Sequence, residues 1–144
     1  MRIEKHTVKS AAEERVVLHL REGNRIGEAI ERLLADEACE LIGYTGEEAV
    51  RLRAEDIVCF TSEGGRVYAR DRERIYTVRL RLYRIESLLS EDFIRINQSC
   101  IANVRQIERF AVSFSGALQV RFWGGYRDYV SRRNLKAVKE RFGL

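Results

Sequence analysis

Residues 57–130 alternate between short apolar stretches and turns rich in Gly, Ser and Asp, and the chain contains no proline. Apolar–polar alternation over a few residues indicates half-buried strands, and Gly-Gly pairs supply the positive φ angles that tight hairpins need. Without proline, every sharp reversal depends on Gly, Asn, Asp or Ser. The pattern therefore predicts a succession of antiparallel hairpins in an α+β fold that is mostly antiparallel β.

Two helices are expected within and after these strands. Apolar residues recur at helical spacing over residues 82–89, which predicts a helix that lies as a lid on the sheet. Ser131 stands at the N-cap of a final helix over residues 132–142, and Gly143 is suited to end it. The strands are expected at residues 49–52, 57–61, 66–70, 75–78, 106–113, 118–122 and 126–130.

The first part of the chain has a different pattern. Two short strands are expected at residues 2–8 and 15–20, an amphipathic helix at 25–34 and a third strand at 40–44. Together they predict a small ββαβ unit. Because the composition changes near residue 44, we expect an N-terminal unit of residues 1–44 and a second domain of residues 45–144.

Charge is divided unevenly between these parts. Residues 1–56 carry 9 Lys or Arg against 13 Asp or Glu, a net charge of −4, whereas residues 57–144 carry 17 against 9, a net charge of +8. Of those 17 basic residues, 15 are Arg. Arginine presents a planar fork of donors that suits phosphates and guanine edges, so the second part is expected to meet a polyanion.

Catalytic and metal-binding patterns are missing from the sequence. The two histidines, His6 and His19, lie near no Cys or carboxylate at ligand spacing. Cys39, Cys59 and Cys100 are odd in number and widely spaced, which predicts reduced core thiols. We therefore expect no enzyme activity, no metal and no cofactor. No apolar run approaches the length of a membrane span, and the N-terminus lacks a signal-peptide pattern, so we expect a cytoplasmic protein.

One stretch, residues 93–103, departs from strand alternation after five residues. Phe93–Asn97 reads as a strand, and the polar residues Gln98 and Ser99 follow it. Ser99 is expected to cap a short helical turn that ends at Asn103 in a left-handed conformation. Two interpretations stay open on these residues alone: a polar turn that serves only the fold, or a loop that presents side chains to another molecule.

Three polar projections from the predicted strands share the basic part of the chain. They are the hairpin tip Gly64–Arg66, the turn Asn97–Ser99 and the helix start Ser131–Arg133. Each one alone is explained equally well as a turn, a cap or a solvated charge. Their combination resembles a known family.

The chain resembles the LytTR family of bacterial DNA-binding domains over about residues 45–144. The resemblance is carried, in order, by Glu55-Asp56-Ile57, residues 76–83, residues 93–103 and residues 129–136. It implies an elongated arrangement of three small antiparallel sheets with a lid helix and a C-terminal helix. It further implies a sequence-specific regulator of transcription that enters the grooves of double-stranded DNA with loop residues instead of a recognition helix.

The resemblance also assigns DNA contacts. Base contacts are expected from Arg66, Gln98 and Arg133, with Arg66 chosen because Gly65 stands where some members carry a long polar side chain. The family often has His where this chain has Asn97, and Asn where it has Gln98. Contacts to the DNA backbone are expected from Arg95, Asn97, Ser99, Arg127, Ser131, Arg132 and Lys136.

Partners follow from the same resemblance. The N-terminal 44 residues are too few for a phosphate-receiver domain, so the chain is similar to the standalone type of LytTR regulator. A homodimer is implied, with the N-terminal unit mediating dimerisation or sensing a partner, and a small membrane protein as a possible regulator. Two other readings stay open: an RNA-binding protein that stacks bases on exposed aromatic residues, and a protein-interaction module whose basic surface meets an acidic partner.

Overall fold

The computed structural model describes residues 41–144 continuously and, before them, only Thr7, Val17, His19, Arg21, residues 25–27 and residues 29–30. The chain divides into two compact units, Met1–Cys39 and Glu40–Leu144. Helix is present at residues 26–27 and 29–30, where the predicted helix begins. Thr7, Val17 and His19 are not in a strand, although the sequence pattern predicts strands that include them. Most other residues of the predicted ββαβ unit before residue 41, Cys39 and His6 included, lie outside the described part.

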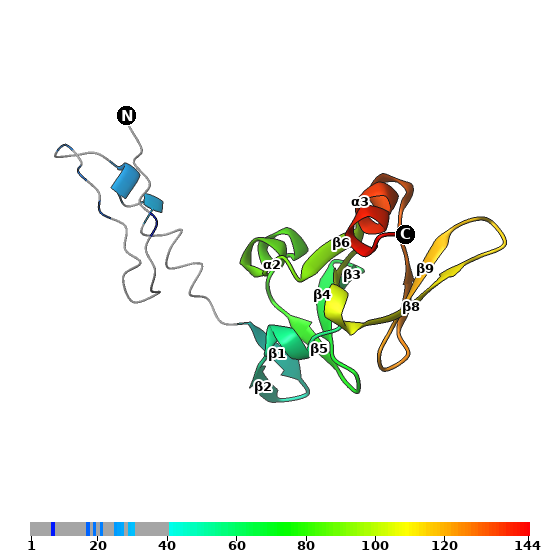
Figure 1. The fold of residues 1–144 in the computed structure, drawn as a ribbon. Coiled ribbons are helices and arrows are strands. Elements are labelled where there is room, and N and C mark those ends of the chain that lie inside the picture. Colours follow the sequence, from blue (N-terminus) through cyan, green and yellow to red (C-terminus); the bar gives the residue numbers. More distant parts are fainter. Residues whose placement is uncertain are drawn as a thin grey trace. The chain divides into compact units, whose positions relative to one another are not determined.

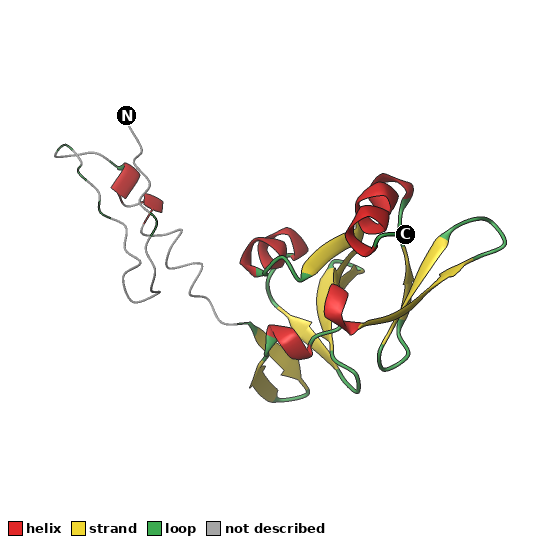
Figure 2. Cartoon of the chain, viewed as in Figure 1, coloured by secondary structure: helices red, strands yellow, loops and turns green. Residues whose placement is uncertain are grey.

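The second unit contains ten strands, two α-helices and two short 3-10 helices (Figures 1 and 2). The helices are η2 (Ala54–Asp56), α2 (Leu82–Leu88), η3 (Val104–Gln106) and α3 (Arg132–Phe142). The strands are β1 (Ile42–Thr45), β2 (Glu48–Arg51), β3 (Cys59–Glu63), β4 (Arg66–Arg70), β5 (Ile75–Val78), β6 (Phe93–Asn97), β7 (Cys100–Asn103), β8 (Ile107–Val112), β9 (Leu118–Phe122) and β10 (Arg127–Tyr129). All strand pairs of the described residues are antiparallel, as predicted.

The strands join into two sheets, so the expectation of three small sheets is wrong for this chain. One sheet has seven strands in the order β2-β1-β5-β4-β3-β7-β6, and the other has three in the order β10-β9-β8. Pairing of β1 with β5 and of β3 with β7 fuses what would otherwise be separate hairpins. The pairing of β1 also places residues 42–44 in the larger sheet, whereas the sequence pattern assigned them to the N-terminal unit.

The larger sheet is buried on both faces at β3 and β7. On one face, Phe60 and Ile101 pack with α2 residues Leu82 and Ile85, so the predicted lid helix is confirmed. On the other face, a second core includes buried residues of the three-stranded sheet and, from α3, Val138. Leu118, Val120 and Phe122 alternate inward along β9. Burial of apolar surface on both faces is the main force that holds the domain together.

Residues 100–103 form β7 and not the expected capped helical turn. All four are buried, and Thr61 of β3 lies opposite Cys100 in the ladder. A short helical turn does occur, but later, as η3. Asn103 caps it, because its side chain accepts a hydrogen bond from the amide of Arg105. The φ angle of Asn103 is −80°, so it is not left-handed.

The C-terminal end of α3 and two of the cysteines agree with the sequence predictions. Gly143 ends α3 in the left-handed conformation, with φ of 66°, as predicted. Cys59 and Cys100 are free, buried thiols, as predicted. A hydrogen bond between the two thiols, with burial as the next cause, raises the pKa of Cys100 well above its ordinary value.

Candidate nucleic-acid interface

The β3–β4 hairpin tip and the β6–β7 turn lie side by side at one end of the larger sheet. Gly64 and Gly65 form the tip with φ angles of 57° and 78°, a conformation that other residues rarely adopt. The amide of Ser62 donates to the carbonyl of Ser99 at 2.9 Å, which extends the β3–β7 ladder up to the turn. The ladder therefore fixes Gln98 and Ser99 next to the hairpin that carries Arg66.

The start of α3 is attached to the same turn. The amide of Ser131 donates to the carbonyl of Ile96 at 2.8 Å, and Asn97 Nδ2 donates to the carbonyl of Tyr129 at 2.8 Å. These two bonds place α3 beside the last residues of β6. We name the assembly of the tip 64–66, the turn 98–99 and the helix start 131–133 the loop end.

Asn97 holds the loop end together and has few groups left for a ligand. Its Nδ2 donates to the carbonyl of Tyr129 and, at 2.9 Å, to the Oδ1 atom of Asp128. Its Oδ1 accepts from the amide of Ser99 at 2.8 Å. Because a side-chain amide has only two N–H donors, both donors of Asn97 are occupied within the protein. Asn97 therefore has a structural role at this turn, and the DNA contact that the resemblance assigned to it stays a prediction.

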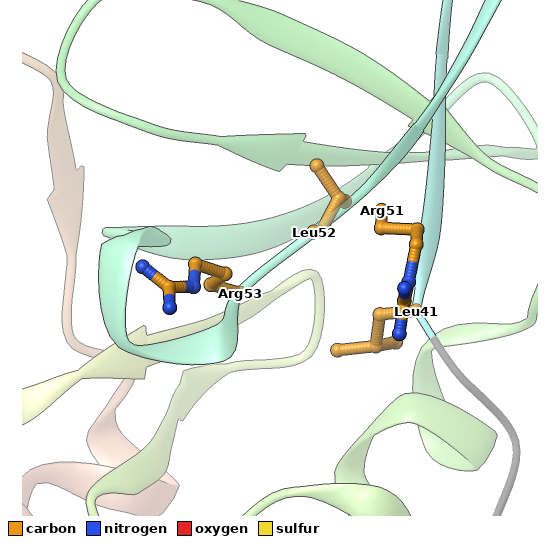
Figure 3. A pocket seen from close by; sticks show the side chains of 4 residues that line it. All are labelled: Leu41, Arg51, Leu52 and Arg53. Carbon is orange, nitrogen blue, oxygen red and sulfur yellow. The ribbon is translucent and has the colours of Figure 1, made fainter.

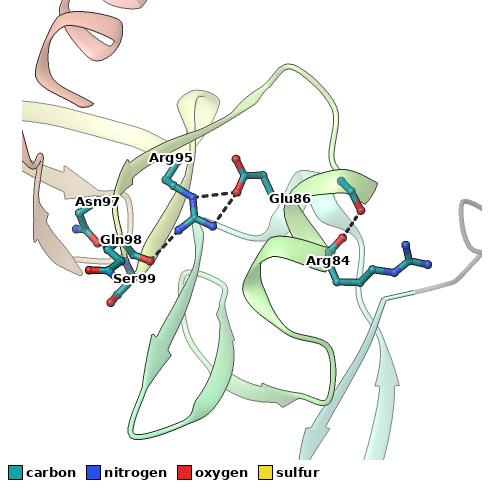
Figure 4. A network of polar contacts seen from close by, with 7 residues as sticks. Arg84, Glu86, Arg95, Asn97, Gln98 and Ser99 are labelled. Carbon is teal, nitrogen blue, oxygen red and sulfur yellow. Dashed lines mark hydrogen bonds and ion pairs between the residues drawn. The ribbon is translucent and has the colours of Figure 1, made fainter. Parts of the chain in front are cut away.

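Arg95 supports the same turn from the side of α2 (Figure 4). Its Nε and Nη2 donate to the Glu86 Oε2 atom at 2.9 and 2.7 Å, and its Nη1 donates to the carbonyl of Gln98 at 2.7 Å. The Arg95 side chain is only 26% exposed. Three of its five donors are thus used inside the domain, and two are left for the contact with the DNA backbone that the resemblance assigned to it.

The other predicted contact residues present their side chains outward. Arg66, Gln98, Ser99, Arg127, Arg132, Arg133 and Lys136 are exposed. Within residues 41–144, Arg66, Arg127, Arg132 and Arg133 form no ion pair, and Lys136 makes only a 4.0 Å contact with Glu140. The loop end thus gathers charges that the domain does not neutralise. Such charges attract polyanions.

Ser131 occupies the N-cap position of α3, but its side chain does not cap the helix. Its Oγ accepts from Asn134 Nδ2 at 2.8 Å, and no cap bond to the backbone is formed. The first amides of a helix have no partner within the helix, and the helix dipole adds positive potential there. This geometry leaves the α3 start able to bind an anion such as a phosphate.

Asp128 is a structural residue of the loop end that the sequence did not reveal. Besides Asn97, it accepts from the hydroxyl of Tyr126 at 3.2 Å and from the amide of Tyr129 at 2.7 Å. Burial, followed by the charge of Asp128, raises the pKa of Tyr126 above its ordinary range. Arg70 lies over the Tyr126 ring, 4.1 Å from its centroid. A lone Asp in a strand gives no local signal of such a role.

The described residues contain no other arrangement that suggests chemistry. A surface pocket beside β2 is lined by Leu41, Arg51, Leu52 and Arg53, and none of these is a carboxylate, thiol or imidazole (Figure 3). No group of three or more His, Cys, Asp or Glu side chains that could hold a metal occurs among them. None of the helices in this part of the chain is long and apolar enough to cross a membrane.

Comparison with known proteins identifies the domain that carries the loop end. Residues 47–143 match the family of LytTr DNA-binding domains. The chain belongs to the LytTR family. Two relatives from Staphylococcus aureus, of strains bovine RF122 / ET3-1 and NCTC 8325 / PS 47, are 32% and 31% identical over 109 residues. Each alignment covers 76% of this chain and 74% of the relative, and both relatives are named HTH-type transcriptional regulators.

A solved LytTr domain shows the same fold. It is the LytTr DNA-binding domain of a methyl-accepting/DNA response regulator from Bacillus cereus, with 20% sequence identity and a TM-score of 0.67. The match covers 74% of this chain and 99% of that structure. The LytTR resemblance and the α+β class predicted from the sequence are therefore confirmed.

The relatives' designation as helix-turn-helix proteins does not describe the LytTR domain seen here. A helix-turn-helix consists of two helices joined by a turn of three or four residues. In residues 41–144, α2 ends at Leu88 and α3 begins at Arg132, with β6 to β10 between them. Residues 41–144 therefore contain no helix-turn-helix.

Proposed function

We propose that the chain is a sequence-specific regulator of transcription that binds double-stranded DNA with the loop end of its LytTR domain, and that it is not an enzyme. The observation that carries the proposal is the convergence of three projections, distant in sequence, whose exposed arginines lack partners within the described domain. Hydrogen bonds from Ser62, Asn97 and Ser131 hold the three together. A rigid support of this kind reduces the entropy that would be lost when the loops bind.

Sequence is read by three exposed side chains. Arg133, in the first turn of α3, donates two hydrogen bonds to guanine O6 and N7, a pairing worth about 1–3 kcal/mol of discrimination. Gln98 is presented by the turn that Arg95 and Asn97 support, and its amide suits the N6 and N7 atoms of adenine. Arg66 extends the reading surface from the hairpin tip.

Phosphate contacts set the position of the protein on the duplex. Arg127, Arg132 and Lys136 supply exposed charges for them, and Ser99 and Ser131 supply hydroxyl groups beside the α3 start. Arg95 and Asn97 act mainly indirectly, because they hold the turn that carries Gln98. Roughly four to seven phosphate contacts make binding steeply dependent on salt.

Selection of bound duplexes from a random library tests this function. The wild-type chain is expected to enrich a defined sequence. Arg133→Ala should relax the preference at one base pair, whereas Lys136→Ala should weaken binding to all duplexes and lower the salt slope by about 1. Enrichment of no sequence, or an unchanged preference in Arg133→Ala, would contradict the assignment. An excess of single-stranded RNA that displaces the duplex would instead favour an RNA-binding role.

The organisation of the full regulator is a further part of the proposal. The N-terminal unit, predicted as residues 1–44 and ending at Cys39 in the structure, mediates homodimerisation or responds to a small membrane protein. The LytTR domain that follows it binds DNA in the cytoplasm. Family members bind repeated half-sites in pairs, which motivates the dimer. Light scattering of the full chain at micromolar concentration is expected to give the mass of a dimer, and a monomer would contradict this part of the proposal.

A further inference from the structure

The outer face of the three-stranded sheet carries three arginines in one row. In the register of the ladder, Arg127 of β10 lies opposite Arg121 of β9, and Arg121 lies opposite Arg109 of β8. Leu118, Val120 and Phe122 point into the core, so the alternating residues of β9 point outward. We name Arg109, Arg121 and Arg127 the arginine row.

One carboxylate partly neutralises the row. A register shift between Ile107 and Arg109 places an extra residue, Glu108, in β8. Glu108 contacts Arg109 at 3.0 Å and Arg121 at 3.2 Å, both as N–O distances. Arg127 forms no ion pair within residues 41–144. Three positive charges and one negative charge leave a net charge of +2 on this small face.

Such a row is unfavourable for the isolated domain. Like charges directly opposite each other on neighbouring strands destabilise a sheet, and here two successive pairs are Arg–Arg. The Arg109 side chain is 59% exposed and that of Arg121 is 35% exposed, so both can reach an external group. A bound polyanion would remove the repulsion, which gives the row a use in a complex that it lacks in the free protein.

The row is continuous with the loop end. Arg127 and Tyr129 occupy the same face of β10, and the carbonyl of Tyr129 is held by Asn97. Ser131, the N-cap of α3, follows two residues later. Neighbouring strands lie about 4.8 Å apart, so the row spans about 10 Å. A row of this length can contact more than one phosphate of a DNA strand.

We propose that the arginine row is a second phosphate-binding strip, which takes the DNA backbone flanking the sequence read by the loop end. The inference rests on the proposed function and adds Arg109 and Arg121 to its contacts. Glu108 limits the strip, because it withholds part of the charge of two of its three arginines. Arg109 and Arg121 face each other at the base of the β8–β9 hairpin (Figure 1), so β8 and β9 bring two of the three charges to the strip.

Substitutions of opposite sign test the strip in the full-length protein. The probes are a long duplex that contains the sequence selected by the wild-type protein and a duplex trimmed to that sequence. Arg109→Gln should lower affinity for the long duplex and reduce the slope of log K against log salt by about 1. Glu108→Gln should raise affinity and steepen the slope, because it frees Arg109 and Arg121. Arg53→Gln, an exposed arginine outside the row, is the matched control and should change neither quantity.

The outcomes separate the two proposals. If the wild-type protein binds DNA but Arg109→Gln and Glu108→Gln both match Arg53→Gln, the strip is wrong and the function of the loop end stands. If the wild-type protein binds no duplex, both proposals are wrong. Equal losses on the long and the trimmed duplex would place the row over the core sequence and would overturn its role on flanking DNA. Unfolding by urea shows whether each variant is folded.

Discussion

The two ends of the β3–β7 ladder use polar side chains in opposite ways. At the loop end, Arg66, Arg132 and Arg133 are exposed and form no ion pair within residues 41–144. At the opposite end, around Val58 and Asn103, polar side chains are bonded to the protein itself. The same sheet therefore carries one end whose segments are connected by polar side chains and one end whose exposed arginines have no acidic partner in the described domain.

At the opposite end, several polar contacts connect segments that are distant in sequence. Asn103, which is 1% exposed, donates to the carbonyl of Ile57 at 2.9 Å. Arg105 pairs with Asp92 at 3.1 Å. Gln106 donates to the carbonyl of Glu55 and accepts from Arg72, each at 3.0 Å. Since buried polar groups are costly when unpaired, these contacts identify the opposite end as structural.

The comparison teaches that residue type does not distinguish a binding residue from a structural one in this domain. Arg105 and Arg133 are both exposed arginines beside a helical turn, but Arg105 has an acidic partner and Arg133 has none in the described part of the chain. Asn97 lies at the loop end and yet resembles Asn103 in its internal bonding. Partners, and not exposure or position alone, separate the two groups.

Asn103→Ala should lower the free energy of unfolding more than the other substitutions, and it should not change the DNA sequence that is bound. The substitution leaves the Ile57 carbonyl and the Arg105 amide without their partner, which costs about 2–4 kcal/mol in the free energy of unfolding. Urea unfolding measures the loss, and the selected DNA sequence should not change. Gln98→Ala is the matched control at the loop end, with a stability change within about 0.5 kcal/mol and an altered sequence preference. If Gln98→Ala lost stability and Asn103→Ala changed the sequence preference, the distinction between the two ends would be wrong.

Asn97→Ala should give an intermediate effect of both kinds. Three hydrogen bonds are lost, but water can replace part of them at this half-buried site, so we expect a loss of about 1–2 kcal/mol in the free energy of unfolding. DNA affinity should fall as well, because the turn that carries Gln98 is loosened. Ser99→Ala, a control at the same turn, should leave stability unchanged. If Asn97→Ala were as stable as the wild-type protein, a direct contact of Asn97 with DNA would be favoured over a supporting role.

Cys100 and Tyr126 should give the smallest effect, because they change stability only in alkali and not at neutral pH. The pKa values of Cys100 and Tyr126 are raised in the folded protein. In the unfolded chain these groups lose protons from about pH 8.5 and about pH 10, so their contribution to stability is complete below those values and is lost as the pH rises further. Urea unfolding should therefore show falling stability in alkali, and Cys100→Ala should show a shallower fall. An identical pH dependence in both proteins would contradict this.

Local sequence patterns predicted elements well where each strand or helix has one buried face. The bounds of β4, β5, β9 and α3 agree with the alternation or helical spacing of their residues. The pattern failed at Cys100–Asn103, because a strand buried on both faces need not alternate. It also failed for the number of sheets, since β1–β5 and β3–β7 pairing joins segments that are distant in sequence.

The candidate site shows the same division. The exposed residues of the loop end, such as Gln98 and Arg133, were named from motifs of the sequence, and their place on the surface agrees with that prediction. The contacts that support the loop end were not predicted, because they join residues that are distant in sequence. Glu86 lies nine residues from Arg95, and Asp128 lies 31 residues from Asn97. No local pattern reports a contact that exists only after the sheets have formed.

The most direct test of the central claim is an NMR titration of the full-length protein with the selected duplex, followed through the backbone amide signals. Our account predicts shifts at residues 64–66, 98–99 and 131–133, with none at residues 103–106. Shifts at residues 103–106, with the loop end unchanged, would contradict it.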